Sequence, residues 1–135
     1  MIKGFHDLPS TSESHGFYDE VIHKYGNAHV WQWVSNALMY LPLAALVDGC
    51  YYALHSGFSD KIPLTLDAVR GLDRCIFDPN DDSAVFNMLT FCPNEETQER
   101  WVLESRDFTY GHAVVKEFHH LNNSTLAIRS FRLAG

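Results

Sequence analysis

Two apolar runs lie in the middle of the chain and set its most evident pattern. The runs at 41–47 and 50–54 are separated only by Asp48 and Gly49. These two residues tolerate the positive φ values of a tight type I′ turn, so the pattern predicts a β-hairpin. Both arms are almost continuously apolar, and we therefore expect helices or a second sheet to cover both of their faces.

His55 follows the second arm directly and precedes Ser56 and Gly57. An imidazole at the mouth of a buried strand is a common position for a metal ligand or an acid/base group, and the two small residues would leave room for a ligand. The alternative is that His55 is a polar residue that ends the strand. The local pattern alone leaves both interpretations open.

Apolar residues recur every three or four positions in several other segments, which indicates amphipathic helices. The predicted helices cover 16–25, 28–39, 65–72 and 111–121. Gly26 ends the first, Asn27 caps the second and Thr65 caps the third. A strand is expected at 124–129.

Two further segments read mainly as irregular structure. Residues 1–15 are polar and contain Pro9, which indicates a loop or a frayed helix start. Residues 76–97 contain acidic turns around a short apolar piece at 85–91, and we expect a surface loop with little regular structure. The acidic turns lack the ligand order of a calcium loop, so we interpret them as solvated turns.

Composition narrows the class of protein. With 135 residues, of which 46% are hydrophobic, the chain is long enough for one domain or part of one. The formal charge of −7 without a Lys/Arg cluster argues against nucleic-acid binding, and nothing indicates a membrane. Without an apolar leader we expect the cytoplasm or the nucleus. Cys50, Cys75 and Cys92 form no CxxC pair, so we expect reduced thiols.

Several longer strings resemble a known family. GFYDEVIHKYGNAHVW (16–31), YLPLAALVDGCYYALHSGFS (40–59) and TLDAVRGLDR (65–74) are similar to the central part of the catalytic subunit of protein phosphatase 2A and related metal-dependent serine/threonine phosphatases. The resemblance is dense over 3–74 and patchy over 104–133. It implies a single partial calcineurin-like phosphatase domain over 1–135. The implied fold is α+β, part of a metallophosphoesterase-type α/β/β/α sandwich with two packed β-sheets flanked by helices.

The resemblance also implies a centre of two divalent metals, manganese or iron/zinc, held by six residues. Three of these belong to upstream motifs that this sequence does not contain. His55 matches one remaining ligand, whereas Phe5 and Phe131 stand at the positions of the other two. Phenylalanine cannot ligate a metal, so the resemblance implies either no bound metal or one weakly bound ion.

Two other positions correspond to groups that contact phosphate in the family. His6 matches a histidine that acts as general acid or phosphate contact, and Arg106 matches a phosphate-binding arginine. An ordinary surface arginine is an equal alternative for Arg106. If the correspondence is correct, His55 lies at a strand end beside His6, with Phe5 and Phe131 close to both.

These observations leave three functional hypotheses. The first is a truncated, catalytically impaired phosphatase domain, a pseudoenzyme, that acts as a binding module for a phosphoprotein or for a regulatory or scaffold protein. Its candidate contact surfaces are the helix at 28–39, with Trp31, Gln32 and Trp33, and the acidic turns at 78–82. The second is an active metal-dependent phosphatase whose missing parts lie outside this chain. The third is a structural subunit of a larger assembly.

Overall fold

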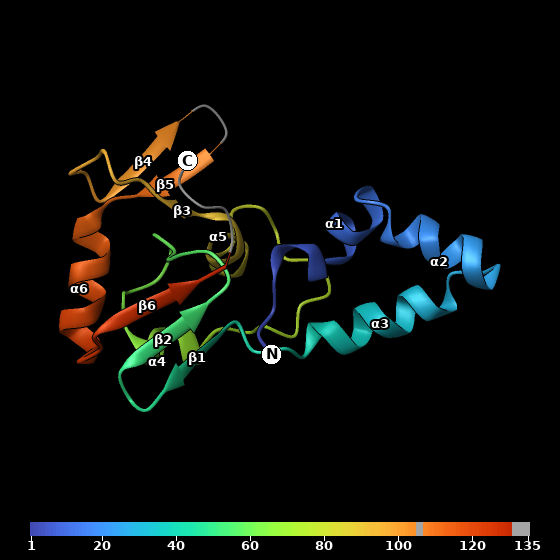
Figure 1. Cartoon of the computed structure of the whole chain (residues 1–135), viewed down its shortest axis with the longest axis horizontal. Helices are drawn as coiled ribbons and strands as arrows, with labels where there is room; N and C mark the ends of the chain where they lie inside the picture. Colours follow the sequence, from blue (N-terminus) through green and yellow to red (C-terminus); the bar gives the residue numbers. More distant parts are fainter. Residues whose placement is uncertain (105–106, 131–135) are drawn as a thin grey trace.

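A computed structural model describes residues 1–104 and 107–130. The chain consists of a body that contains two small sheets and a helical arm that extends from it (Figure 1). The arm is formed by the helices α1 (Pro9–Ser14), α2 (Phe17–Tyr25) and α3 (His29–Met39). The short 3-10 helix η1 (Phe5–Asp7) contacts both α1 and α3 and thereby joins the arm to the body.

The body holds the remaining elements. They are β1 (Ala44–Val47), β2 (Tyr51–Leu54), α4 (Leu66–Arg70), α5 (Ala84–Thr90), β3 (Cys92–Pro93), β4 (Trp101–Glu104), β5 (Asp107–Tyr110), α6 (His112–Asn122) and β6 (Leu126–Arg129). The first sheet has the strand order β1-β2-β6, and the second has the order β3-β5-β4. This mixed α+β architecture, with two small sheets flanked by helices, confirms the predicted fold class.

The predicted hairpin is confirmed. Asp48 and Gly49 have φ values of 53° and 68°, and the Cys50 N–H donates to the Val47 carbonyl at 3.2 Å, which closes the turn. Tyr51 pairs with Val47 on one side of β2 and with Leu126 of β6 on the other. The long-range pairing of β2 with β6 is parallel, whereas the hairpin itself is antiparallel.

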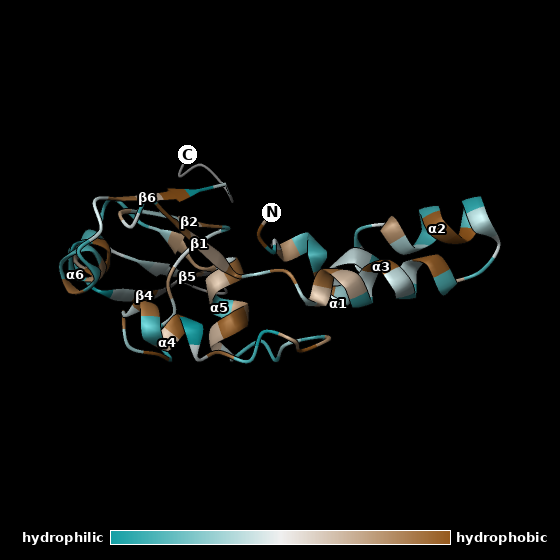
Figure 2. Cartoon of the chain, turned by 90° about the horizontal axis from the view of Figure 1, so that it is seen from below, coloured by the Kyte–Doolittle hydropathy of each residue, from teal (hydrophilic) through white to brown (hydrophobic). Residues whose placement is uncertain are grey.

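The expectation that both faces of the hairpin are covered is wrong for the described residues. Tyr52 and Leu54 point into the core, but Val47 is 55% exposed and Tyr51 is 41% exposed. Because side chains alternate between the faces of a strand, the exposed residues of the three strands share one face of the first sheet. We call Val47, Tyr51, Leu126 and Ile128 the bare sheet face. Strand β6, which carries the last two, lies along the upper edge of the body in Figure 2.

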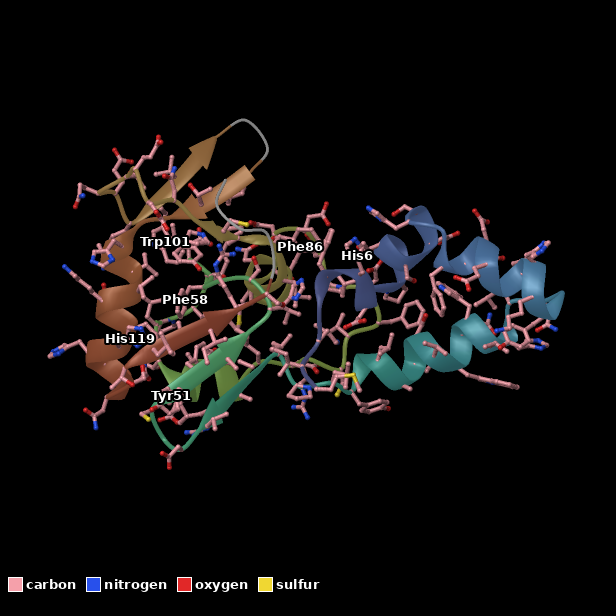
Figure 3. All side chains as sticks on the ribbon, in the orientation of Figure 1. His6, Tyr51, Phe58, Phe86, Trp101 and His119 are labelled. Carbon is pink, nitrogen blue, oxygen red and sulfur yellow. The ribbon has the colours of Figure 1, made fainter. Side chains whose placement is uncertain are left out.

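Two apolar clusters hold the body together. The first lies between the two sheets and α6 and contains Tyr52, Leu54, Phe58, Leu64, Phe91, Tyr110, Val114 and Phe118. The second surrounds α5 and η1 and contains Leu8, Leu43, Val85, Met88 and Leu89. Phe58 lies at the centre of the body in Figure 3, and its ring contacts those of Tyr52, Tyr110 and Phe118.

The helix-ending residues act largely as the sequence predicts. Gly26 ends α2 with a φ of 71°, and its N–H donates to the Ile22 carbonyl at 2.8 Å. Thr65 caps α4, because its hydroxyl oxygen accepts from the Ala68 N–H at 3.2 Å. Asn27 accepts from the His29 N–H at 3.0 Å, which satisfies a free donor at the start of α3.

The two segments predicted as irregular contain regular structure. Within 76–97, Ser83 caps α5, which buries Val85, Met88 and Leu89 in the second cluster. The prediction of a surface loop is therefore wrong for the centre of this segment. The first fifteen residues form η1 and α1, with Pro9 in the first turn of α1, where a missing N–H is tolerated. Strands β3, β4 and β5 were not predicted.

A buried lysine fixes the start of the chain. Lys3 is only 1% exposed, and its ammonium donates to the carbonyls of Met39 at 3.0 Å and Arg74 at 3.1 Å. Its backbone N–H donates to the Pro42 carbonyl at 2.8 Å. Burial lowers the pKa of the Lys3 ammonium. These bonds hold Gly4 to Asp7 beside the end of the first sheet.

All three cysteines are free thiols, as predicted. In the described part of the chain, no helix is both long and apolar enough to cross a bilayer.

Candidate functional site

The candidate site begins where β2 ends. Leu54 is the last residue of β2, so His55 lies at a strand end as predicted. The parallel register continues past the strands, because the Ser130 N–H donates to the His55 carbonyl at 3.1 Å. The Nδ1 atom of His55 also lies 3.3 Å from the Ser130 hydroxyl oxygen. The strand pairing therefore orients the imidazole.

The N-terminal segment forms the opposite wall of the site. A Cβ atom added at Gly4 would lie 3.2 Å from Nδ1 and Cε1 of His55, so this backbone passes very close to the imidazole. The Gly4 N–H donates to Oδ2 of Asp7 at 2.7 Å, which turns the chain into η1. A short segment thus brings His6 and Asp7 to the end of the first sheet.

Burial and two neighbouring charged groups shift the pKa of His55. Burial lowers the pKa of the imidazole, and the nearby His6 lowers it further, whereas the carboxylate of Asp7 raises it. The net shift is downward, so His55 favours its neutral form, which is the form that binds metals. His6 and Asp7 lie close enough to influence His55 electrostatically.

His6 lies on an exposed aromatic face at the base of the helical arm (Figure 3). Its ring is 4.9 Å from the ring of His15 in an edge-to-face arrangement and 5.6 Å from that of Phe5. His15 is in turn fixed by a hydrogen bond between its Nδ1 and the Thr11 carbonyl at 2.9 Å. This arrangement gives His6 an aromatic support and leaves the imidazole accessible to solvent.

Phe5 faces the apolar side of η1. Its ring meets that of Phe86 edge-on at 5.9 Å, and it packs against the second cluster around Leu8. Phe86 appears between His6 and the body in Figure 3. Phe5, which the resemblance places at a metal-ligand position, therefore extends the apolar core. The site is apolar on this side.

The expectation that Ser56 and Gly57 leave room for a ligand is wrong. The Ser56 hydroxyl is fully buried and donates to the Phe91 carbonyl at 2.7 Å. A Cβ atom at Gly57 would lie 2.3 Å from both the Phe91 carbonyl oxygen and Cε1 of Tyr110. The two small residues are needed because the end of α5 and strand β5 occupy that space.

The donor set does not fit a two-metal centre within residues 1–104 and 107–130. In these residues no three His, Cys, Asp or Glu side chains are grouped so that they could hold a metal ion. Asp7 and His6 both influence the pKa of His55, and Oδ2 of Asp7 accepts the Gly4 N–H. Arg106 and Phe131, the other predicted site positions, lie outside the described residues.

Sequence reasoning missed three neighbours of the predicted residues. Asp7 was visible beside His6, but its effect on His55 depends on the path of the N-terminal segment. Ser130 reaches His55 only through the parallel pairing of β6 with β2, and His15 reaches His6 only because α1 folds back. The local sequence pattern indicated neither the contact of Ser130 with His55 nor that of His15 with His6.

Comparison with known proteins relates this arrangement to one class of enzyme. No protein-family model matches the chain. Among solved structures, the chain is similar to a protein serine/threonine phosphatase from Saccharomyces cerevisiae that has similarity to human phosphatase PP5. The TM-score is 0.84 and the sequence identity is 25% over 98% of this chain.

The match covers 41% of the yeast protein, so the chain spans less than half the length of the solved structure. It supports the phosphatase resemblance at the level of the serine/threonine phosphatases in general and does not single out the phosphatase 2A branch. A phosphatase relative implies metal dependence in general, although the described donor set does not identify a metal. The chain has the fold of part of a serine/threonine phosphatase domain.

Proposed function

We propose that this chain is a catalytically impaired, phosphatase 2A-like domain that acts as a binding module for a phosphoprotein or for a regulatory or scaffold protein. The observation that carries the proposal is the position of Phe5. Its ring packs against Phe86 at 5.9 Å, beside His6, where the family correspondence calls for a metal-binding amide. An apolar ring removes one ligand and also disfavours a charged metal–water centre at this point.

The remaining polar groups do not compensate for this loss. His55 favours its neutral form and lies beside Gly4 and Ser130, which supports at most one metal bond from this side. Family phosphatases use two metal ions to activate water and to neutralise the phosphate. Without a second group of ligands, His6 has no activated nucleophile to assist, and phosphoester hydrolysis is not expected.

Hydrolysis of a phosphothreonine peptide in the presence of manganese tests this proposal. We expect the folded chain and a His6→Gln/His55→Gln double variant to release phosphate at the same background rate. Equal rates identify any residual activity as contamination, because both preparations carry the same impurities. A manganese-dependent rate that the double variant loses would overturn the proposal.

An active phosphatase remains the second candidate, and the similarity to the yeast phosphatase over 98% of this chain favours it. In that case, polypeptide outside these 135 residues supplies the missing ligands. The same assay, repeated after addition of candidate completing segments, distinguishes the two candidates, because only the second predicts activation. A structural subunit, the third hypothesis, predicts that the isolated chain is insoluble or unfolded.

A further inference from the structure

Two histidines that are distant in the sequence pattern meet at the base of the helical arm. His6 lies in η1, and His15 is the residue that ends α1. Helix α1 has six residues and contacts η1, so the chain folds back and brings the two imidazoles together. Figure 1 shows α1 where the arm leaves the body. Both histidines are exposed, so ions in solution can reach them.

The hydrogen bonds of His15 determine which of its ring nitrogens is available. Nδ1 lies 2.9 Å from the Thr11 carbonyl oxygen, which can only accept a hydrogen bond, so Nδ1 carries the proton of the neutral ring. The Ser14 hydroxyl lies 3.1 Å from the same nitrogen but donates its own proton to the Thr11 carbonyl. The lone pair of the neutral ring is therefore on Nε2.

This hydrogen bond is of the kind that supports metal-binding histidines. Such histidines commonly donate the N–H of the ring nitrogen that does not bind the metal to a backbone carbonyl, which fixes the tautomer and the orientation of the ring. His15 has this partner in the Thr11 carbonyl. The ring is thus held in the tautomer that presents Nε2 to a ligand.

His6 has both ring nitrogens available. Among residues 1–104 and 107–130, its ring contacts Phe5 and His15, and neither nitrogen makes a hydrogen bond or an ion pair. A neutral imidazole is a good ligand for zinc, copper and nickel, whereas manganese prefers oxygen ligands. The chemistry of the pair therefore favours an ion of the zinc type.

The separation of the two rings fits one shared ion. Their centroids are 4.9 Å apart, and their planes are inclined by 72°. Zinc binds an imidazole nitrogen at about 2.0–2.1 Å, which places the ion roughly 3.2 Å from the ring centroid. Two rings at the tetrahedral angle around one ion then have centroids roughly 5.2 Å apart. The observed distance is close to this value.

An edge-to-face contact between the rings is the alternative, since aromatic pairs prefer centroid distances of about 4.5–7 Å. Two observations favour an ion. Both histidines are exposed, so their contact buries little apolar surface. In the described part of the chain, no hydrogen bond occupies Nε2 of His15 or either nitrogen of His6.

We propose that His6 and His15 form a two-histidine site for a zinc ion, which links η1 to the end of α1 and stabilises the base of the arm. The described residues group no third His, Cys, Asp or Glu with this pair, so water completes the coordination shell and the affinity is modest. The site uses neither His55 nor the position of Phe5. It does not depend on the proposed function.

Calorimetric titration of zinc chloride into the full 135-residue chain tests the proposal. We expect one ion per chain. His6→Gln and His15→Gln are each expected to raise the dissociation constant about tenfold or more, because a single imidazole remains. His29→Gln is the matched control, since this imidazole is also exposed and in ring contact, but with Trp33 at 6.2 Å. Manganese at the same concentrations is expected to give no comparable heat.

His55→Gln separates this site from the metal centre that the family resemblance implies. We expect it to leave the zinc affinity within about threefold of wild type. Loss of binding in His55→Gln without an effect of His15→Gln overturns the proposal. The absence of zinc-dependent heat, or binding that His6→Gln and His15→Gln do not both weaken, shows a ring contact only and overturns it as well.

NMR of the wild-type chain provides a second measurement that requires no variant. Zinc is expected to shift the imidazole signals of His6 and His15 together and to leave those of His29 unchanged. Signals that shift for every exposed histidine alike overturn the proposal, because they indicate unselective binding. Manganese-dependent phosphate release would contradict the proposed function and would leave this zinc site unaffected.

Discussion

At the scale of single residues, the candidate site depends on a glycine that no local pattern explains. Gly57 follows His55 by two positions and has its Cβ space filled by the Phe91 carbonyl and the Tyr110 ring. Its N–H also donates to the Met88 carbonyl at 3.2 Å. Gly57 therefore allows β2 and α5 to approach each other closely, which fixes the segment that carries His55.

Gly57→Ala is expected to lower the free energy of unfolding by about 1–3 kcal/mol, because the new methyl group must displace a backbone carbonyl and a buried ring. Chemical denaturation followed by circular dichroism measures this change. Gly71→Ala is the matched control, since its Cβ would lie 3.5 Å from the Asp67 carbonyl in open surroundings, and its effect should stay within about 0.5 kcal/mol. Equal effects of the two variants would contradict the packing role of Gly57.

The difference between His55 and Gly57 also marks what the sequence reveals at this scale. His55 was predicted at a strand end because its position depends only on the apolar run before it. The need for glycine at position 57 arises from Phe91 and Tyr110, which fill the space of a side chain there and lie more than thirty residues away in the sequence. Local patterns indicate where a side chain sits along an element, but not which distant backbone it meets.

At the scale of elements, the errors have a common cause. The helices at 16–25, 28–39 and 111–121 were predicted because their apolar residues repeat over several turns. Helix α5 has only seven residues between acidic turns, so its periodicity was too short to recognise. Strands β3 to β5 are shorter still, with two to four residues each, and tertiary contacts, which the local sequence does not contain, stabilise them.

Asn122 shows how one side chain joins two elements. It is the last residue of α6, and its amide nitrogen donates to the Leu64 carbonyl at 2.8 Å and to the Phe118 carbonyl at 2.7 Å. Its amide oxygen accepts from the Leu66 N–H at 2.7 Å, at the start of α4. This single amide thus closes the end of one helix and holds the beginning of another.

Asn122→Leu is expected to lower the free energy of unfolding by about 2–4 kcal/mol, because three hydrogen bonds are lost and the Leu64 carbonyl and the Leu66 N–H, around the start of α4, lose their partner. Urea denaturation measures the loss. Asn123→Gly serves as the control at the next position, where the φ of 50° favours glycine, and we expect no loss of stability there. A stable Asn122→Leu variant would show that water replaces the amide.

At the scale of the whole molecule, the strand order determines which distant residues meet at the candidate site. The parallel pairing of β6 with β2 brings Ser130 to His55, and Lys3 ties the N-terminal segment to α3 and to the loop after α4. The family resemblance indicated that His6 and His55 belong to one region. The hydrophobic pattern alone would not have done so, since 48 residues separate them.

The same arrangement bears on the proposed function. No three metal-binding side chains are grouped in the described residues, and Phe5, which the resemblance places at a ligand position, packs into the apolar core. The bare sheet face adds exposed apolar surface. These features support the proposal that the chain binds a partner and does not hydrolyse phosphoesters.

Calorimetric titration of manganese into the folded chain tests this claim most directly. Circular dichroism first establishes that the preparation is folded, and His55→Gln provides the matched control. We predict weak binding that does not saturate as a two-ion site, and a small further loss in His55→Gln, because one imidazole gives little affinity by itself. Tight, saturable binding of two ions that His55→Gln abolishes would contradict the account and restore the metal centre of an active phosphatase.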